Sequence, residues 1–277
     1  MNHRLNALTV FALSSLIIHS PALAQTGAAQ PGVAQSGDTR PARRIMLGGG
    51  IQTVATYPGA SGNKAAFLPF VDTWREGGQF PVESPDEANG FAVLGQRGGT
   101  AFGPAISFAD QRAADAVPGL AAVGFGVEAG AFAETWLAPP LRLRAELRHG
   151  IGAHRALTGD IAADFAWRQG PGESAVATFG PRLRWGSAKF NRAYFAVPAA
   201  APGTAPVGTF APYDPGSGIY AAGVNAGLRL PLGSTFGLYG YAGYDRLIGT
   251  AADSPVVRAG SRDQYSAGLA LTYRFTI

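Results

Sequence analysis

Residues 264–277 alternate between apolar side chains and small or polar ones. The apolar members are every second residue: Tyr265, Ala267, Leu269, Leu271, Tyr273, Phe275 and Ile277. Successive side chains of a β-strand point to opposite faces of the sheet, so this stretch predicts a strand with one apolar face and one wet face.

The same period of two runs through the middle of the chain. It is clearest in residues 123–133, 141–151, 157–168 and 177–185. Apolar residues spaced by two would spread around a helix and give it no apolar face, so the pattern excludes an amphipathic helix. A soluble β-sandwich also alternates. Two features favour a membrane barrel instead: aromatic residues lie at strand ends (Trp167, Trp185 and Tyr273), and charged residues fill the opposite faces.

The composition agrees with a membrane barrel. Only 14% of the residues are charged, against about 25% in soluble domains. Glycine is abundant, at 39 of 277 residues, and the net charge of +4 is scattered rather than gathered into a basic block. No nucleic-acid partner is therefore expected. Cysteine is absent, which excludes disulfides and thiolate metal sites.

Both the beginning of the chain and the lead-in after it predict export. Residues 1–24 have a short basic start, an apolar stretch and Ala22-Leu23-Ala24 as a cleavage site, which is typical of a secretory signal peptide. Residues 25–42 are poor in apolar residues and are expected to form a disordered periplasmic lead-in. No stretch of 18 apolar residues follows, so a membrane helix is not expected. Residues 43–277 are then the outer-membrane β-barrel of a Gram-negative bacterium.

The barrel is expected to be antiparallel, with twelve strands as the best fit and ten as the alternative. An even count places both termini in the periplasm and makes every second connection short. The alternation is weakest in residues 64–98, where the count is least certain. The predicted outer loops are 58–63, 110–119, 187–218 and 250–263. The predicted strands are 43–57, 64–74, 78–84, 88–95, 99–109, 120–135, 140–152, 157–168, 174–186, 219–231, 234–249 and 264–277.

Charged residues line the predicted inner faces of four successive strands. The candidates are Glu128, Arg142, Arg144, Glu146, Arg148, Asp160, Asp164, Arg182 and Arg184. Glu134 belongs to the same run, but a bulge could turn it outward. Opposite charges on neighbouring strands attract each other, so the ladder could brace a narrow barrel. The same charges could instead select small solutes that pass through the lumen.

The predicted outer loop 187–218 is the candidate for contact with other molecules. It carries five aromatic residues among alanine, proline and glycine: Phe190, Tyr194, Phe195, Phe210 and Tyr213. Long ordered loops are usually functional. The alternatives are a lid that folds over the lumen and a simply flexible chain.

The sequence offers little support for catalysis or for a cofactor. Only His149 and His154 follow the predicted cleavage site, and no Gly-x-Ser-x-Gly motif occurs. Two histidines without a nearby carboxylate make a poor metal site. The Gly48-Gly49-Gly50 run lacks the lysine of a phosphate loop and is interpreted as a close-packed strand.

Several stretches resemble the MipA/OmpV family of outer-membrane proteins. The family pattern AGYxRLLGDAADSPIV, followed by xQFSAGLGLSYRF, is similar to residues 242–257 and 263–275 here. Residues 141–148, 158–160 and 180–185 also match, whereas residues 76–98 do not. Family members usually stop at the terminal phenylalanine, but here Thr276 and Ile277 follow Phe275.

The resemblance implies an outer-membrane barrel without known enzymatic activity. The family's namesake is a scaffold that brings together a murein-degrading lytic transglycosylase and a murein-synthesising penicillin-binding protein. Other members resemble adhesins or uptake porins. The expected partners are therefore outer-membrane lipid or lipopolysaccharide and, for a scaffold, these two enzymes. The resemblance does not choose between scaffold, small-solute pore and adhesin.

Overall fold

The computed structural model describes residues 42–199 and 210–277. The predicted signal peptide (1–24) and all but the last residue of the predicted lead-in (25–42) lie outside the described residues. The described residues form twelve strands and three short helices. They are β1 (Arg43–Ala55), β2 (Asn63–Arg75), β3 (Asn89–Gly90), β4 (Leu94–Gly95), β5 (Ala101–Phe108), β6 (Val127–Ala138), β7 (Leu141–Ile151), β8 (Leu157–Arg168), β9 (Val176–Gly186), α1 (Ala188–Phe195), β10 (Gly218–Leu232), β11 (Phe236–Leu247), α2 (Gly249–Asp253), α3 (Pro255–Ala259) and β12 (Asp263–Thr276).

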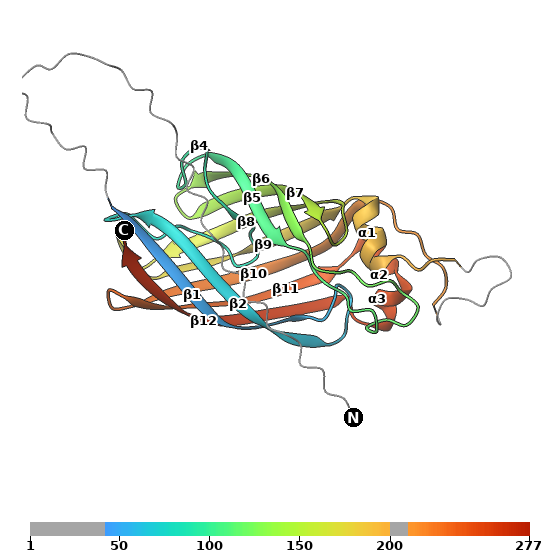
Figure 1. Ribbon diagram of the computed structural model, residues 1–277. Coiled ribbons are helices and arrows are strands. Elements are labelled where there is room, and N and C mark those ends of the chain that lie inside the picture. The colour runs from blue at the N-terminus through green and yellow to red at the C-terminus, as the bar shows by residue number, and fades with distance from the viewer. Residues whose placement is uncertain (1–41, 200–209) are drawn as a thin grey trace, which may run out of the picture. The chain divides into compact units, whose positions relative to one another are not determined.

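The strands form a single antiparallel sheet that curls into an incomplete barrel (Figure 1). From β5 to β12 each strand pairs with its neighbour in the sequence, and β12 then pairs with β1. Arg44 lies opposite Thr276, so the first and last strands meet at one rim. The prediction of an all-β antiparallel barrel with twelve strands is confirmed, although β3 and β4 contain only two residues each.

The strand bounds differ from the prediction in the region where alternation was weakest. No strand forms over 78–84, and the predicted strand 88–95 is reduced to β3 and β4. Residues 79–88 instead lie against the inner face of the barrel, where both their side chains and their backbone groups bond to side chains of the wall rather than to a neighbouring strand. The predicted strand 120–135 is shifted and runs from Val127 to Ala138.

The sheet has two edges that do not pair with each other among the described residues. One edge is β2 and the other is β3, with β4 beside it on β5. Pro69 lies on β2, and proline has no N–H to donate to a further strand. Strand β2 is therefore suited to an edge of the sheet, next to the gap that separates it from β3.

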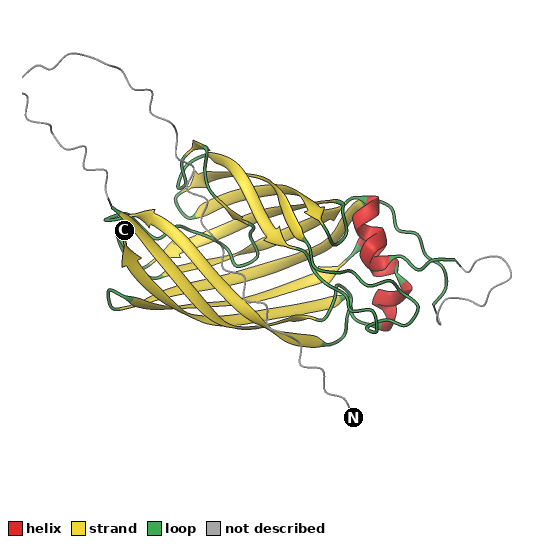
Figure 2. Cartoon of the chain, in the orientation of Figure 1, coloured by secondary structure: helices red, strands yellow, loops and turns green. Residues whose placement is uncertain are grey.

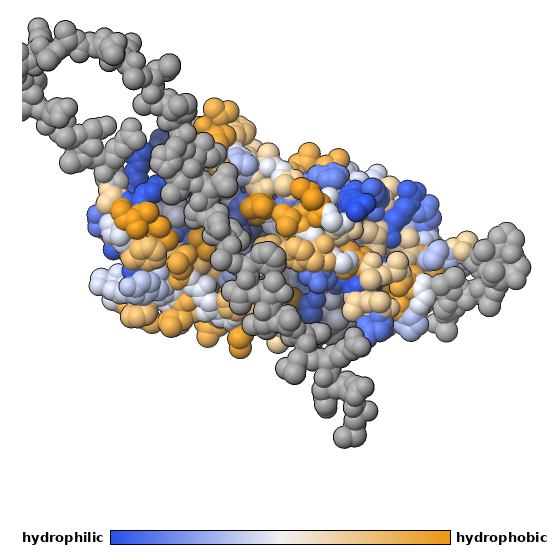
Figure 3. Space-filling view, viewed as in Figure 1, coloured by the Kyte–Doolittle hydropathy of each residue, from blue (hydrophilic) through white to orange (hydrophobic). Residues whose placement is uncertain are grey.

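The two faces of the sheet differ sharply in polarity. Many of the outward-facing residues along the strands are large and apolar, and Figure 3 shows such residues spread over the side in view. Examples are Ile51, Phe67, Ile106, Leu147, Ile161, Phe179 and Leu269. The inner face carries buried charged and polar residues. An apolar skin around a polar interior is the pattern of a transmembrane barrel.

The three helices gather at the end of the barrel opposite the C-terminus (Figure 2). The predicted loop 187–218 begins with α1, which is capped where the Ser187 hydroxyl accepts a hydrogen bond from the Phe190 N–H. The predicted loop 250–263 contains α2 and α3. None of the helices in the described residues is long and apolar enough to cross a membrane.

Candidate functional site

Residues 79–88, here called the inner segment, are held against the interior wall by contacts of their side chains and of their backbone groups. Phe80 is buried and packs edge-to-face on Trp74, with ring centroids 5.0 Å apart. The Ser84 hydroxyl donates a hydrogen bond to Asp164 on β8 (2.8 Å), and the Ala88 N–H donates to Glu146 on β7 (3.2 Å). The inner segment thus connects β2 to strands in the opposite part of the sheet.

The most buried part of the interior is an ion-pair network centred on Asp164. Its carboxylate accepts from Arg142 on β7 (2.8 Å) and from Arg182 on β9 (2.7 Å). The Arg142 and Asp164 side chains are at most 1% exposed. Arg142 also pairs with Glu87 of the inner segment, and Arg182 pairs with Asp86 (2.9 Å). The inner segment is therefore part of the network.

A second group of pairs surrounds Arg144. It contacts Glu146 at 2.8 Å and Glu134 at 3.0 Å, and its guanidinium lies 4.0 Å from the centroid of the Phe132 ring. Glu134, whose direction was left open from the sequence, points inward. The irregularity in β6 falls at Trp136–Ala138, after Glu134, so it does not turn this side chain outward.

Arg148 and Arg184 continue the network toward the end that carries the helices. Arg148 contacts Glu128 (2.9 Å), Asp160 (2.5 Å) and Glu146. Arg184 contacts three carboxylates, those of Asp86 (2.9 Å), Asp160 (3.1 Å) and Asp245 (3.1 Å). One guanidinium therefore serves three acids.

The structure places all nine charged candidates in this one network on the inner face. They are Glu128, Arg142, Arg144, Glu146, Arg148, Asp160, Asp164, Arg182 and Arg184. The sequence reasoning missed three of their partners, Asp86, Glu87 and Asp245. Asp245 could have been found, because it lies in the alternating run that became β11, whereas the inner segment has no such period.

The two histidines have different environments. His154 is buried, and its Nε2 lies 2.9 Å from Glu128 Oε1. Its ring packs edge-to-face on Phe190, with centroids 4.9 Å apart. His149 is exposed on β7. Within the described residues no group of three or more histidine, cysteine or acidic side chains could hold a metal ion.

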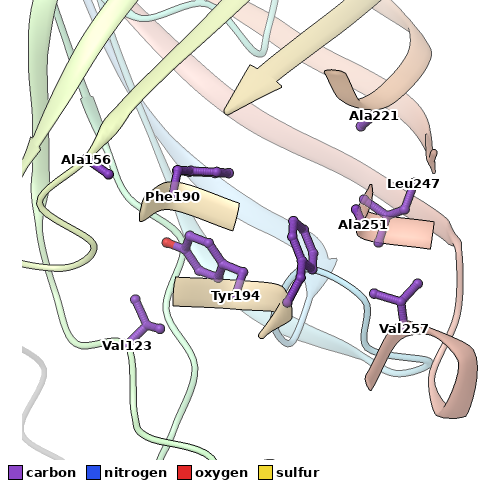
Figure 4. Packing of buried hydrophobic residues seen from close by; sticks show 9 residues of the cluster. Val123, Ala156, Phe190, Tyr194, Ala221, Leu247, Ala251 and Val257 are labelled. Atoms are coloured by element: carbon purple, nitrogen blue, oxygen red, sulfur yellow. The ribbon is translucent and has the colours of Figure 1, made fainter. Parts of the chain in front are cut away.

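Three aromatic residues of the predicted loop 187–218 lie inside the molecule rather than on its surface. Phe190, Tyr194 and Phe195 are at most 4% exposed, so they do not offer an outer contact surface. They belong to an apolar cluster at the helical end of the barrel, in which Figure 4 labels Phe190 and Tyr194. Burial raises the pKa of the Tyr194 phenol above its usual value. The other members of the cluster are Val123, Ala156, Ala221, Leu247, Ala251 and Val257.

Hydrogen bonds fasten this cluster to the neighbouring loops. The Tyr194 hydroxyl donates to the Asp110 carbonyl (2.7 Å), and the Ser254 hydroxyl donates to the Phe195 carbonyl (2.7 Å). Phe210 and Tyr213 are partly buried against a second apolar cluster, and the Tyr213 hydroxyl donates to the Thr250 carbonyl (2.6 Å). These loops together form a cap at the helical end of the barrel.

A cavity of about 390 Å³ lies between the inner segment and the cap. Pro85 and Asp86 of the inner segment line it on one side, and Phe190 and Tyr194 of α1 line it on the other. Its walls are the inner faces of the strands. The cavity contains both charged and aromatic side chains, which suits a small polar molecule rather than an apolar one.

A family model described as MltA-interacting protein MipA matches residues 47–275. The chain belongs to the MipA family. This match confirms the resemblance found in the sequence. The matched range includes residues 76–98, which resemble the family least. The comparison with curated proteins gives no match.

Among solved structures, the crystal structure of the outer membrane protein OprG from Pseudomonas aeruginosa is similar at 9% identity. The alignment covers 85% of this chain and 96% of OprG, with a TM-score of 0.24.

Proposed function

We propose that this MipA-family chain is an outer-membrane β-barrel of a Gram-negative bacterium that acts as a non-enzymatic scaffold. The apolar outer face supports contact with outer-membrane lipid or lipopolysaccharide. The predicted signal peptide supports export, with both termini in the periplasm. The proposal assigns the chain no catalytic activity.

The observation that carries the scaffold proposal is the filled interior. The inner segment lies within the barrel and joins the buried ion pairs of β7, β8 and β9. A buried polar network whose charged groups are paired makes the structure more rigid. Such an interior stiffens the barrel and is poorly suited to rapid passage of solutes.

The partners are proposed from the family description, which names an MltA-interacting protein. A lytic transglycosylase of the MltA type is then the first candidate, and a penicillin-binding protein is the second. The proposed contact surface is the rim formed by the short turns around 76–78, 96–99, 138–140, 169–175 and 233–235, together with residues 25–42.

Co-purification tests the scaffold. The full chain is isolated from detergent-solubilised envelopes and probed for murein hydrolases and synthases. A matched variant replaces the turn residues Gln169–Gly172 and keeps Glu173, and a control variant carries Lys189→Ala at an exposed position of α1. The scaffold predicts that both the wild type and the control retain a murein enzyme while the turn variant loses it. Retention of no murein enzyme by the wild type would contradict the proposal.

The cavity favours a small-solute pore as the second candidate function. The inner segment would then be the barrier, and Asp86→Asn with Glu87→Gln would loosen it by removing its pairs with Arg182, Arg184 and Arg142. Planar-bilayer recording distinguishes the two functions. Regular conductance steps from the wild type would favour a pore, whereas steps from the double variant alone would favour a plugged scaffold. A surface adhesin gains no support from Phe190, Tyr194 and Phe195, because these side chains are buried.

A further inference from the structure

The cavity beneath the cap carries an excess of negative charge. The acidic residues that line it are Asp86, Asp110, Glu128 and Asp245, whereas the basic ones are Arg148 and Arg184. Arg182 also pairs with Asp86 and Arg148 with Asp160, whereas Asp245 pairs within the described residues with Arg184 alone and shares that guanidinium with Asp86 and Asp160. Asp110 forms no ion pair within the described residues, and it is exposed. The walls therefore attract a cation.

One polar side chain of the wall lacks a partner. Asn225 on β10 is 5% exposed and lines the cavity, and its Oδ1 has no hydrogen-bond partner among the described residues. A buried amide without partners costs free energy. Rotation of the amide by half a turn would present its oxygen to the cavity instead of its nitrogen. Asn225 is thus available to a ligand in either orientation.

The strands beside Asn225 bring two further acceptors close to it. Asn225 lies opposite Gly243 on β11, and Gly243 lies opposite Ser266 on β12. A Cβ placed on Gly243 would lie 3.2 Å from Asn225 Nδ2 and 2.7 Å from Ser266 Oγ, so the missing side chain leaves the space between them open. Asp245 follows two residues later on the same face of β11 and also lines the cavity.

The chemistry of this group matches a primary ammonium. An ammonium group has three donors and no acceptor. Asn225, Asp245 and Ser266 offer an amide oxygen, a carboxylate and a hydroxyl oxygen. Tyr220 and Tyr241 also line the cavity, and aromatic faces attract organic cations.

We propose that the cavity between the inner segment and the cap binds a small organic ammonium ion, held by Asn225, Asp245 and Ser266 and lying against Tyr220 and Tyr241. This site is independent of the scaffold role, which concerns the opposite rim. The proposed ligand lies at the end of the barrel that carries the cap.

Isothermal titration of the detergent-purified full chain tests the site. The probe is 1,4-diaminobutane, with 1,4-butanediol and succinate as neutral and anionic analogues of similar length. Saturable binding of the diamine alone is expected. Asn225→Leu and Asp245→Asn should each weaken it by about tenfold or more, since each removes a hydrogen bond to a charged group. Gly243→Ala should also weaken it, because the methyl group fills the open space.

The control is Asp214→Asn, which removes an exposed carboxylate paired with Arg192 and leaves the cavity intact. It should bind the diamine as the wild type does. If Asn225→Leu fails to fold, Ser266→Ala takes its place with the same expected direction. Absence of saturable diamine binding, equal binding of butanediol, or unchanged affinity in the folded cavity variants would overturn the proposal.

Discussion

Glu173 and Arg44 form a bidentate ion pair across the end of the barrel. Arg44 on β1 donates from Nε to Oε1 at 2.9 Å and from Nη2 to Oε2 at 3.1 Å. Glu173 belongs to the turn between β8 and β9, and β10, β11 and β12 separate that hairpin from β1 in the sheet. The same carboxylate accepts from Trp74 (3.0 Å) and Arg274 (2.9 Å). One turn residue therefore ties β1, β2 and β12 to the opposite wall.

Glu173→Gln should destabilise the barrel by roughly 2 kcal/mol, because the side chain gives up hydrogen bonds to two arginines. Arg274 is almost fully buried and would keep an uncompensated charge. Urea unfolding of the reconstituted protein, followed by tryptophan fluorescence, measures the change. Glu76→Gln, at an exposed position on the same rim, should have almost no effect. Equal stability of the two variants would contradict the bracing role of Glu173.

Arg142→Leu should cost about 3–5 kcal/mol, since it leaves Asp164 and Glu87 buried without their shared partner. The matched control is Arg258→Leu, which breaks a pair with Asp253 whose two side chains are each 61% exposed. Exposed pairs contribute about 0–1 kcal/mol. Denaturant midpoints of the two variants provide the comparison. A small loss in Arg142→Leu would mean that the network does not brace the barrel.

Gly50→Ala should strongly reduce the yield of folded barrel. A Cβ at this position would lie 1.9 Å from the Leu269 carbonyl oxygen of β12, so the β1–β12 pairing would have to shift. Overpacking of this kind costs about 1–3 kcal/mol or more. Heat-modifiable migration on a denaturing gel reports the folded fraction. Gly124→Ala is the control, because its Cβ would meet no atom within 4 Å.

Phe195→Ala should open the cap without unfolding the barrel. Phe195 is completely buried in the apolar cluster that joins α1 to α2 and α3. Truncation of a buried phenylalanine to alanine lowers the free energy of unfolding by about 3–5 kcal/mol. Here it should destabilise the cap rather than the strands. Limited proteolysis of the reconstituted protein should show faster cleavage within 187–218. Lys189→Ala, on the exposed side of α1, should be cleaved at the rate of the wild type.

The strands from β6 to β12 were predictable because each of them buries one face and exposes the other. In β7, charged residues (Arg142, Arg144, Glu146 and Arg148) alternate with apolar ones, so the sequence indicates both the inner and the outer face. The burial of residues alternates in the same way throughout β7. The charged candidates followed directly from the period, since any charge out of phase would have faced lipid.

The inner segment could not be predicted in this way. Pro81 and Pro85 have no N–H for a ladder, and Asp86 and Glu87 find their partners on β7 and β9 through folding rather than through local sequence. Helix α1 is indicated only weakly in the sequence. Phe190, Tyr194 and Phe195 are spaced as one face of a helix after the Ser187 cap. Read as a helix, the same residues would have predicted burial instead of outside contact.

The pairing of β1 with β12 determines when the molecule can become complete. Arg44 lies 232 positions before Thr276, so no fragment that stops short of β12 can satisfy the hydrogen bonds of β1 on both sides. Such distant partners make folding slow. A chain that lacks β12 leaves this edge of β1 unpaired and open to aggregation, so completion of the sheet depends on a strand that lies far along the sequence.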